Sequence, residues 1–257
     1  MDESGHWYDK DGHLILEVPR ARGGGTRPPN LRDARKYSYL PSVTTVLGVV
    51  DRPGLRVWWT EAVIETALRL PHATKGEIIE EASAYVEWAA QQGSKIHLGI
   101  SEHFNGRYIS IEPEVDATVR EFWPWYSTSG LVVLRSERPV VSPLGYAGTV
   151  DYEGTYDGHP CFLDFKTQDF DRVQDANFYD EHALQLAGYA EAAGHPEYKR
   201  LSAILSRTTP GLVAFHDWTP ENARWSKAWL ALWEFWQHLK NYYPGRPVDP
   251  DQMGRYR

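Results

Sequence analysis

Two carboxylates and a lysine near the middle of the 257-residue chain are spaced as in a site that could cleave phosphodiester bonds. Asp151 closes the run Gly148-Thr149-Val150-Asp151, and the run Asp164-Phe165-Lys166-Thr167 follows it. Because side chains alternate across a β-strand, we expect Asp164 and Lys166 on one face, with Asp151 beside them at the end of the preceding strand. Two carboxylates can hold a hard divalent cation such as Mg²⁺. A lysine beside that cation can orient the attacking water and offset charge on the phosphate.

The strands that would position these residues are predicted from local composition. β-Forming and apolar residues fill 147–153 and 161–165, and Asp157-Gly158 between them is a hairpin-turn dipeptide. Two charges that enter such an apolar strand need partners or a metal. The alternative is a structural Asp–Lys pair on a sheet surface, since Asp-X-Lys alone is a short motif.

Three further segments contain candidate site residues. Gln185 and Tyr189 lie four residues apart on a helix predicted over 177–193, so they share one face. His97 lies in a helix predicted over 75–104 and is either a nitrogen ligand or a structural histidine. Glu137 lies on a strand predicted from Leu131, where it either lines the metal pocket or pairs with a neighbouring arginine.

Read in order, the motifs are Gly-X-X-X-His (93–97), a strand Glu, Gly-X-X-Asp (148–151), Asp-X-Lys (164–166) and Gln-X-X-X-Tyr (185–189). This order resembles the RecB-like exonuclease branch of the PD-(D/E)XK nuclease superfamily over about residues 39–189. With the run Pro41-Ser42-Val43-Thr44, it resembles the family of the mitochondrial genome maintenance exonuclease and its phage and bacterial relatives.

The resemblance implies an α/β fold with a central mixed sheet flanked by helices and a helical insertion over the active site. It implies Asp151, Asp164, His97 and the backbone carbonyl of Phe165 as ligands of one or two Mg²⁺ or Mn²⁺ ions, with Lys166 as the catalytic lysine. It also suggests residues that support the site or bind nucleic acid, namely Gln185, Tyr189, Thr167, Ser42 and Lys95. In such relatives the insertion admits only a single strand. Candidate DNA contacts on the insertion here are Arg56, Trp58, Trp59 and Trp88, unless the tryptophans pack the helices together.

Composition sets limits on this reading. A net charge of −8 argues against a DNA-coating protein but not against a nuclease, whose metal site needs carboxylates. The basic stretch from Arg20 to Lys36 contains Gly23-Gly24-Gly25 and is expected to be an exposed loop, either along a phosphate backbone or simply solvated. The single cysteine, Cys161, excludes a cysteine-ligated iron–sulfur cluster.

We expect a single nuclease domain over 1–257, with an N-terminal hairpin and basic loop (6–50), an arch-like insertion (53–92), a catalytic core (93–218) and a C-terminal helix (219–242). That last helix is predicted to begin with Thr219 as N-cap and to bury a stripe formed by Trp225, Trp229, Trp233 and Trp236. Neither a membrane span nor a signal peptide is recognisable. A cytoplasmic protein of bacterial or phage origin, not secreted, is the simplest interpretation.

The expected function is a metal-dependent DNA exonuclease of repair or recombination that prefers single-stranded DNA or DNA ends. The sequence does not identify a replication or recombination partner. Three alternatives remain open. They are a double-strand-specific recombination exonuclease of the phage type, an inactive nuclease-fold DNA-binding module, and a glycosidase using Asp151 and Asp164, which has no use for Lys166.

Overall fold

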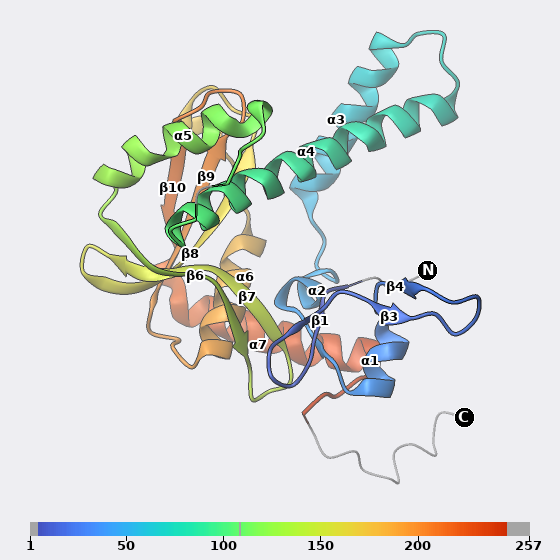
Figure 1. The fold of residues 1–257 in the computed structure, drawn as a ribbon, viewed down its shortest axis with the longest axis vertical. Helices are drawn as coiled ribbons and strands as arrows, with labels where there is room; N and C mark the ends of the chain where they lie inside the picture. Colours follow the sequence, from blue (N-terminus) through green and yellow to red (C-terminus); the bar gives the residue numbers. More distant parts are fainter. Residues whose placement is uncertain (1–4, 108, 246–257) are drawn as a thin grey trace.

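The centre of the molecule is a five-stranded mixed β-sheet, seen in a computed structural model that describes residues 5–107 and 109–245 (Figure 1). The strand order is β10–β9–β8–β7–β6, with β8 and β9 parallel and the other neighbours antiparallel. The strands are β6 (Leu131–Val141), β7 (Ala147–Tyr156), β8 (His159–Gln168), β9 (Lys199–Ser206) and β10 (Val213–Asp217). The expected mixed sheet flanked by helices is therefore confirmed.

The strand pair that was predicted around the acidic motifs is present. Asp157 and Gly158 both have positive φ, 48° and 77°, as a tight hairpin turn between β7 and β8 requires. The parallel step from β8 to β9 runs through a short 3₁₀ helix, η1 (Val173–Asp175), and then through α6 (Asp180–Ala193). The expected start of α6 at Asn177 is wrong, because the Gln168 side chain bonds both the N–H and the carbonyl of Asn177 and holds it outside the helix.

Helices cover both faces of the sheet. α6, α7 (Asn222–Lys240) and α2 (Val43–Leu47) pack on one face, where Phe162 of β8 joins their apolar cluster. α4 (Lys75–Phe104) and α5 (Pro113–Thr128) pack on the other face with Leu163 and Phe165. This alternation along β8 follows from the pleat of a strand. Burying each large apolar side chain contributes about 1.5–3 kcal/mol.

The predicted tryptophan stripe on α7 is confirmed, since Trp225, Trp229, Trp233 and Trp236 are all buried in the cluster with α6. Gly188 permits the close approach of the two helices, because an added Cβ there would lie 2.9 Å from the Trp229 ring. The prediction of Thr219 as N-cap is wrong. Thr219–Glu221 forms the 3₁₀ turn η2, and the Thr219 hydroxyl accepts a hydrogen bond from the N–H of Arg200 at 3.2 Å instead.

The N-terminal region forms a small sheet of β1 (Trp7–Tyr8), β2 (Leu14–Ile15) and β5 (Leu40–Pro41). The predicted N-terminal hairpin is present as the antiparallel pair β1–β2, which turns around Asp11-Gly12. The basic stretch is only partly a loop. It contains the hairpin β3 (Val18–Pro19) to β4 (Thr26–Arg27) and the helix α1 (Leu31–Tyr37). A capping box between Asn30 and Asp33 starts α1 and overrides the loop expectation.

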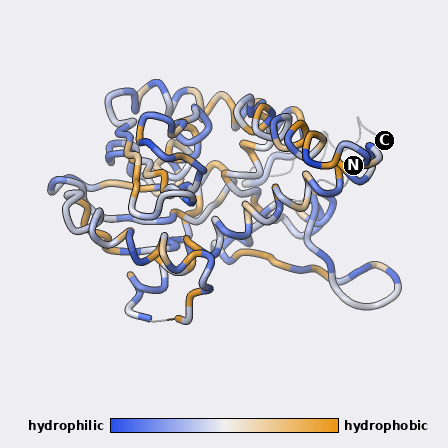
Figure 2. Tube along the Cα trace, turned by 90° about the horizontal axis from the view of Figure 1, so that it is seen from above, coloured by the Kyte–Doolittle hydropathy of each residue, from blue (hydrophilic) through white to orange (hydrophobic). Residues whose placement is uncertain are grey.

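α3 (Pro53–Arg69) and the first part of α4 form a helical hairpin that projects from the body of the protein (Figure 1). A capping box between Thr74 and Glu77 starts α4. α4 then continues without interruption to Phe104, so the expected boundary between insertion and core falls inside one helix. In the described part of the chain no helix is long and apolar enough to cross a membrane, and hydrophilic residues recur along the helices in Figure 2.

Candidate active site

The candidate site lies where β7 and β8 separate. Their ladder runs from Tyr156 opposite His159 to Tyr152 opposite Leu163 and then ends. Past this point β8 stays in the sheet through its pairing with β9, which continues to Gln168. Asp151 lies inside β7, whereas it was expected at the end of that strand. Its side chain spans the gap, because Oδ2 accepts a hydrogen bond from the N–H of Phe165 at 3.1 Å.

Asp164 and Lys166 form an ion pair on the predicted common face. Lys166 Nζ donates to Asp164 Oδ1 at 2.8 Å, and the Asp164 side chain is 1% exposed against 29% for Lys166. Gln185 Nε2 donates to the same Oδ1 at 2.9 Å and to the hydroxyl of Tyr189 at 3.0 Å. The other carboxylate oxygen of Asp164, Oδ2, is buried without a hydrogen-bond partner among the described residues.

His97 approaches this pair from α4. Its Nδ1 lies 3.6 Å from Asp151 Oδ2, and its ring packs edge-on against Phe165 with centroids 6.5 Å apart. Burial, assisted by the charge of Lys166, lowers the pKa of His97 to about 4. The imidazole is therefore neutral at physiological pH, which is the form that binds metal ions.

Burial removes water from the carboxyl groups of the site, and neighbouring charges and hydrogen bonds do not fully replace it, so their pKa values are raised. Burial raises the pKa of Asp164 to about 6, with Lys166 opposing this shift and Asp151 adding to it. Burial also raises the pKa of Asp151, while Lys166 and the Phe165 N–H lower it. For Lys166 burial lowers the pKa, but the charges of Asp164 and Asp151 outweigh burial and leave it raised. The ammonium group is therefore charged when both carboxylates are.

Glu137 faces Asp151 across the β6–β7 pair, between the registered pairs Ser136–Tyr152 and Arg138–Val150. Its φ of 52° is left-handed, an uncommon backbone conformation for a residue other than glycine. Burial and the charge of Asp151 raise the pKa of Glu137 to about 7. The residue as a whole is nevertheless exposed, so solvent water screens both influences and the shift is an upper limit. The arginines on either side of it pair with Glu153 instead.

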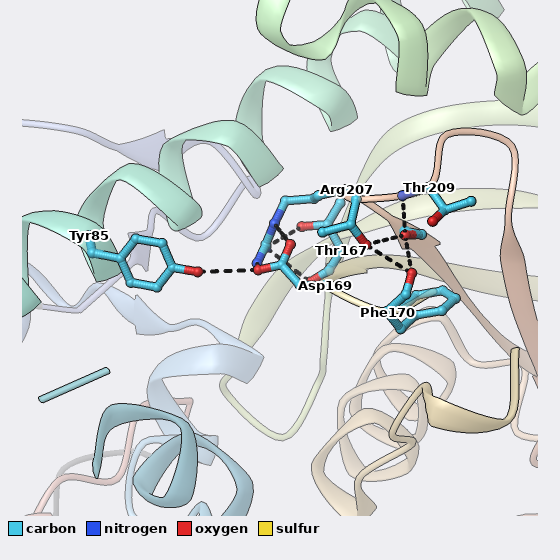
Figure 3. A network of polar contacts seen from close by, with 8 residues as sticks. Tyr85, Thr167, Asp169, Phe170, Arg207 and Thr209 are labelled. Atoms are coloured by element: carbon cyan, nitrogen blue, oxygen red, sulfur yellow. Dashed lines mark hydrogen bonds and ion pairs between the residues drawn. The ribbon is translucent and has the colours of Figure 1, made fainter. Parts of the chain in front are cut away.

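Three of the expected supporting residues have other contacts. Ser42 is buried as the N-cap of α2, where its hydroxyl accepts from the N–H of Thr45 at 2.8 Å. Lys95 pairs with Glu112 at the start of α5. Thr167 follows Lys166 on β8, and its hydroxyl accepts from Arg207 at 3.3 Å (Figure 3).

The candidate DNA contacts lie on the two helices of the projecting hairpin. Arg56 pairs with Asp51 at 3.1 Å. Trp59 is half-buried, as is Trp58, whose ring lies 6.0 Å from that of Tyr85. Trp88 is 47% exposed and stacks on Tyr85, with centroids 5.9 Å apart and planes inclined by 23°.

An ion-pair network joins this hairpin to the end of β8. Arg207 binds both oxygens of Asp169, through Nε at 2.9 Å and Nη2 at 2.8 Å. The hydroxyl of Tyr85 donates to Asp169 from α4 at 3.3 Å (Figure 3). These contacts position the aromatic pair Tyr85–Trp88 relative to the strand that carries Lys166.

Sequence reasoning missed two charged or titratable neighbours of the site. His182 is buried one turn before Gln185, and the spacing 182, 185, 189 on one helical face is the signal that would have revealed it. Burial and the charges of Lys166 and Arg52 lower the pKa of His182 to about 3. Arg52 precedes α3 and acts electrostatically on both Lys166 and His182, without any motif to mark it.

The donor set fits a divalent cation, although no three His, Cys, Asp or Glu side chains of the described residues are grouped as a formed metal site. Asp164 Oδ1 accepts a hydrogen bond from Lys166, while Oδ2 has no hydrogen-bond partner among the described residues. Carboxylate oxygens are ligands that suit Mg²⁺ or Mn²⁺, and the neutral imidazole adds one nitrogen donor to the set. A cation between Asp151 and Asp164 would offset the desolvation that raises both pKa values.

Comparison with known proteins does not assign a family. No protein-family model matches the chain, and no curated protein matches it. Among solved structures, one titled "Crystal structure of SSO0001" is 14% identical over 74% of this chain and 88% of that chain, with a TM-score of 0.30. Similarity at this level does not define a common fold or activity.

Proposed function

We propose that this protein is a Mg²⁺- or Mn²⁺-dependent DNA exonuclease with a PD-(D/E)XK core of the RecB-like branch. The observation that carries the proposal is the buried Asp164–Lys166 pair, beside Asp151 and His97, at the point where β7 and β8 separate. A structural Asp–Lys pair on a sheet surface needs neither a second buried carboxylate nor a neutral histidine. It would also not leave Asp164 Oδ2 buried without a partner among the described residues.

Each residue of the site has a role that follows from its position. Asp151, Asp164 and His97, with the carbonyl of Phe165, would hold the metal ion. The bound ion would supply Lewis-acid stabilisation of the phosphate and would favour deprotonation of the attacking water. Lys166 keeps its proton and donates a hydrogen bond toward developing negative charge. Gln185 fixes the Asp164 carboxylate and so orients it for the ion.

The preference for single strands is supported by the projecting hairpin. Tyr85 and Trp88 are 39% and 47% exposed and stacked, so they offer a flat apolar face beside the end of β8. Aromatic faces of this kind bind unpaired bases by stacking, at about 1–3 kcal/mol per base and without sequence preference. A base within a duplex has no free face for such contact.

The test is metal-dependent digestion of four substrates. These are linear single-stranded DNA labelled at the 5′ end, the same strand labelled at the 3′ end, a circular single strand and a blunt duplex. Lys166→Ala is the inactive variant, and Lys227→Ala, on the exposed face of α7, is the matched control that keeps wild-type activity. EDTA is expected to abolish cleavage.

Trimming of linear single strands with survival of circles is the expected result, and the released label gives the polarity. Cleavage of circles would show an endonuclease instead. Consumption of duplex ends alone would favour the phage-type recombination exonuclease. Absence of cleavage with both metals, or full activity of Lys166→Ala, would refute the proposed catalytic site.

A further inference from the structure

Residues 18–50 have the opposite charge balance from the rest of the chain. They include six basic residues against one acidic residue, which gives a net charge of +5 in a chain whose total is −8. The one acidic residue, Asp33, is buried and accepts hydrogen bonds from Arg27 at 2.7 and 3.0 Å. This stretch therefore presents cations to solvent and no exposed carboxylate of its own.

Most of these cations are free of carboxylate partners. Four are exposed and form no ion pair within the described part of the chain, namely Arg20, Arg22, Arg32 and Lys36. Arg35 differs, because its Nη2 donates to the carbonyl of Lys240 at the end of α7. Outside the stretch, most lysines and arginines of the described residues pair with a carboxylate, as Arg120 does with Asp116. Unpaired cations that are close in the chain leave a positive field, which attracts anions.

The four unpaired cations belong to one compact piece of structure, formed by β3, β4 and α1 over residues 18–37, which we call the basic module. The β3–β4 hairpin carries two of them, and α1 carries the other two, four residues apart on one helical face. The ion pair between Arg27 and Asp33 joins β4 to the first turn of α1. At the hairpin tip, residues 23–25 are three glycines with positive φ, and a Cβ added to any of them would have no neighbour within 4 Å. The tip is thus open to a ligand that approaches the backbone closely.

The basic module is attached to the strand that carries a proposed metal ligand. α1 leads into β5, which pairs with β1, and the Tyr8 hydroxyl of β1 shares a hydrogen bond with the Thr149 hydroxyl at 2.9 Å. Thr149 precedes Asp151 by two residues on β7, and Ser42 forms a β-bridge with Ala147 at the start of the same strand. The basic module and the projecting hairpin extend from the central sheet on the same side (Figure 1).

We infer that the basic module binds the phosphate backbone of single-stranded DNA, beyond the nucleotides that occupy the active site. The inference rests on the proposed function, which supplies a single strand whose end lies at the metal site. Three of the four unpaired cations are arginines, and the planar guanidinium group can bind two oxygens of one phosphate. Contacts to phosphates hold a strand without reading its bases, as degradation of any sequence requires.

The test measures binding of oligothymidylates in EDTA, so that nothing is cleaved, by fluorescence anisotropy over a series of salt concentrations. Lengths of about 5 and about 30 nucleotides are compared, since one single-strand site commonly covers about 4–16 nucleotides. The variant is Arg22→Gln/Arg32→Gln/Lys36→Gln. The matched control, Arg120→Gln/Arg224→Gln/Lys227→Gln, removes the same charge from exposed positions on α5 and α7.

We expect the basic-module variant to bind the long oligonucleotide about tenfold more weakly or worse at low salt, because about three phosphate contacts are lost. The slope of log K against log salt concentration should become shallower by about 2, or about 0.7 per lost contact. Arg22→Gln alone should change this slope by about 0.7. The short oligonucleotide should bind equally to the wild type and the variant, and the matched control should behave as the wild type with both lengths.

A variant with the wild-type slope and affinity for the long oligonucleotide would overturn the inference. So would an equal loss of affinity in the matched control, or for the short oligonucleotide. Displacement of the long oligonucleotide by polyglutamate at the same concentration of charge would show a surface for anionic polypeptides and would overturn the assignment to DNA. Cleavage of the short oligonucleotide with Mg²⁺ should be unchanged in the variant, so failure of the proposed active site is recorded separately from failure of the basic module.

Discussion

Gln185 holds the central carboxylate of the candidate site, and Gln185→Leu removes that support without opening a large cavity. The wild-type side chain donates one hydrogen bond to Asp164 Oδ1 and one to the Tyr189 hydroxyl. A bond to a charged group contributes about 1.5–3 kcal/mol and a neutral one about 0.5–1.5 kcal/mol. At about pH 8 Asp164 is ionised, so we expect the variant to lose roughly 2–4 kcal/mol of unfolding free energy.

Urea denaturation in EDTA measures this loss, and the slope with denaturant should stay constant if the unfolded state is unchanged. Tyr189→Phe is the matched control, because it removes only the neutral partner and should cost about 0.5–1.5 kcal/mol. Cleavage by Gln185→Leu should fall about 10–100-fold, as for other residues that orient metal ligands. A variant with wild-type unfolding free energy and wild-type cleavage would refute the idea that Gln185 supports Asp164.

Three other predictions follow from contacts at the site. Gly148→Ala places a Cβ 2.6 Å from the Tyr189 ring and should cost about 1–3 kcal/mol in urea denaturation; wild-type stability would contradict the packing. The pKa of His182 is lowered from 6.5 to about 3, so folding favours its neutral form, and the contribution of His182 to the unfolding free energy should decline as pH falls from 6.5 towards 3, by at most about 1.4 kcal/mol per pH unit. His182→Gln should reduce this slope, and an unchanged slope would show that His182 does not cause it. Mg²⁺ or Mn²⁺ at a hundredfold excess over its Kd should stabilise the wild type by about 2.7 kcal/mol in thermal unfolding. Asp164→Asn should abolish that gain, and a gain kept by Asp164→Asn would place the ion elsewhere.

Local signals in the sequence were sufficient for most of the elements that carry the candidate site. The turn at Asp157-Gly158 requires positive φ at both positions, so it defines the β7–β8 hairpin. Strand alternation then places Asp164 and Lys166 together, and helical spacing does the same for Gln185 and Tyr189. These outcomes depend on neighbours within a few residues, which is why the sequence predicts them.

Element ends were less predictable where a distant group competes for the backbone. Gln168 holds Asn177 outside α6, and the N–H of Arg200 engages the hydroxyl of Thr219. The position of Asp151 also depends on a distant group. The strands β7 and β8 separate beside it, and the N–H of Phe165 donates a hydrogen bond to its carboxylate. A hydrogen bond between residues far apart in the chain leaves no local pattern.

The sequence alone therefore determined which residues are candidates for chemistry, namely the acidic pair, the lysine and the glutamine–tyrosine face. Only the tertiary structure brought His182 and Arg52 near Lys166 and tied the projecting hairpin to Arg207 through Asp169. The physical reason is that residue type and spacing set local geometry, whereas burial and electrostatic environment arise from segments that meet only after folding.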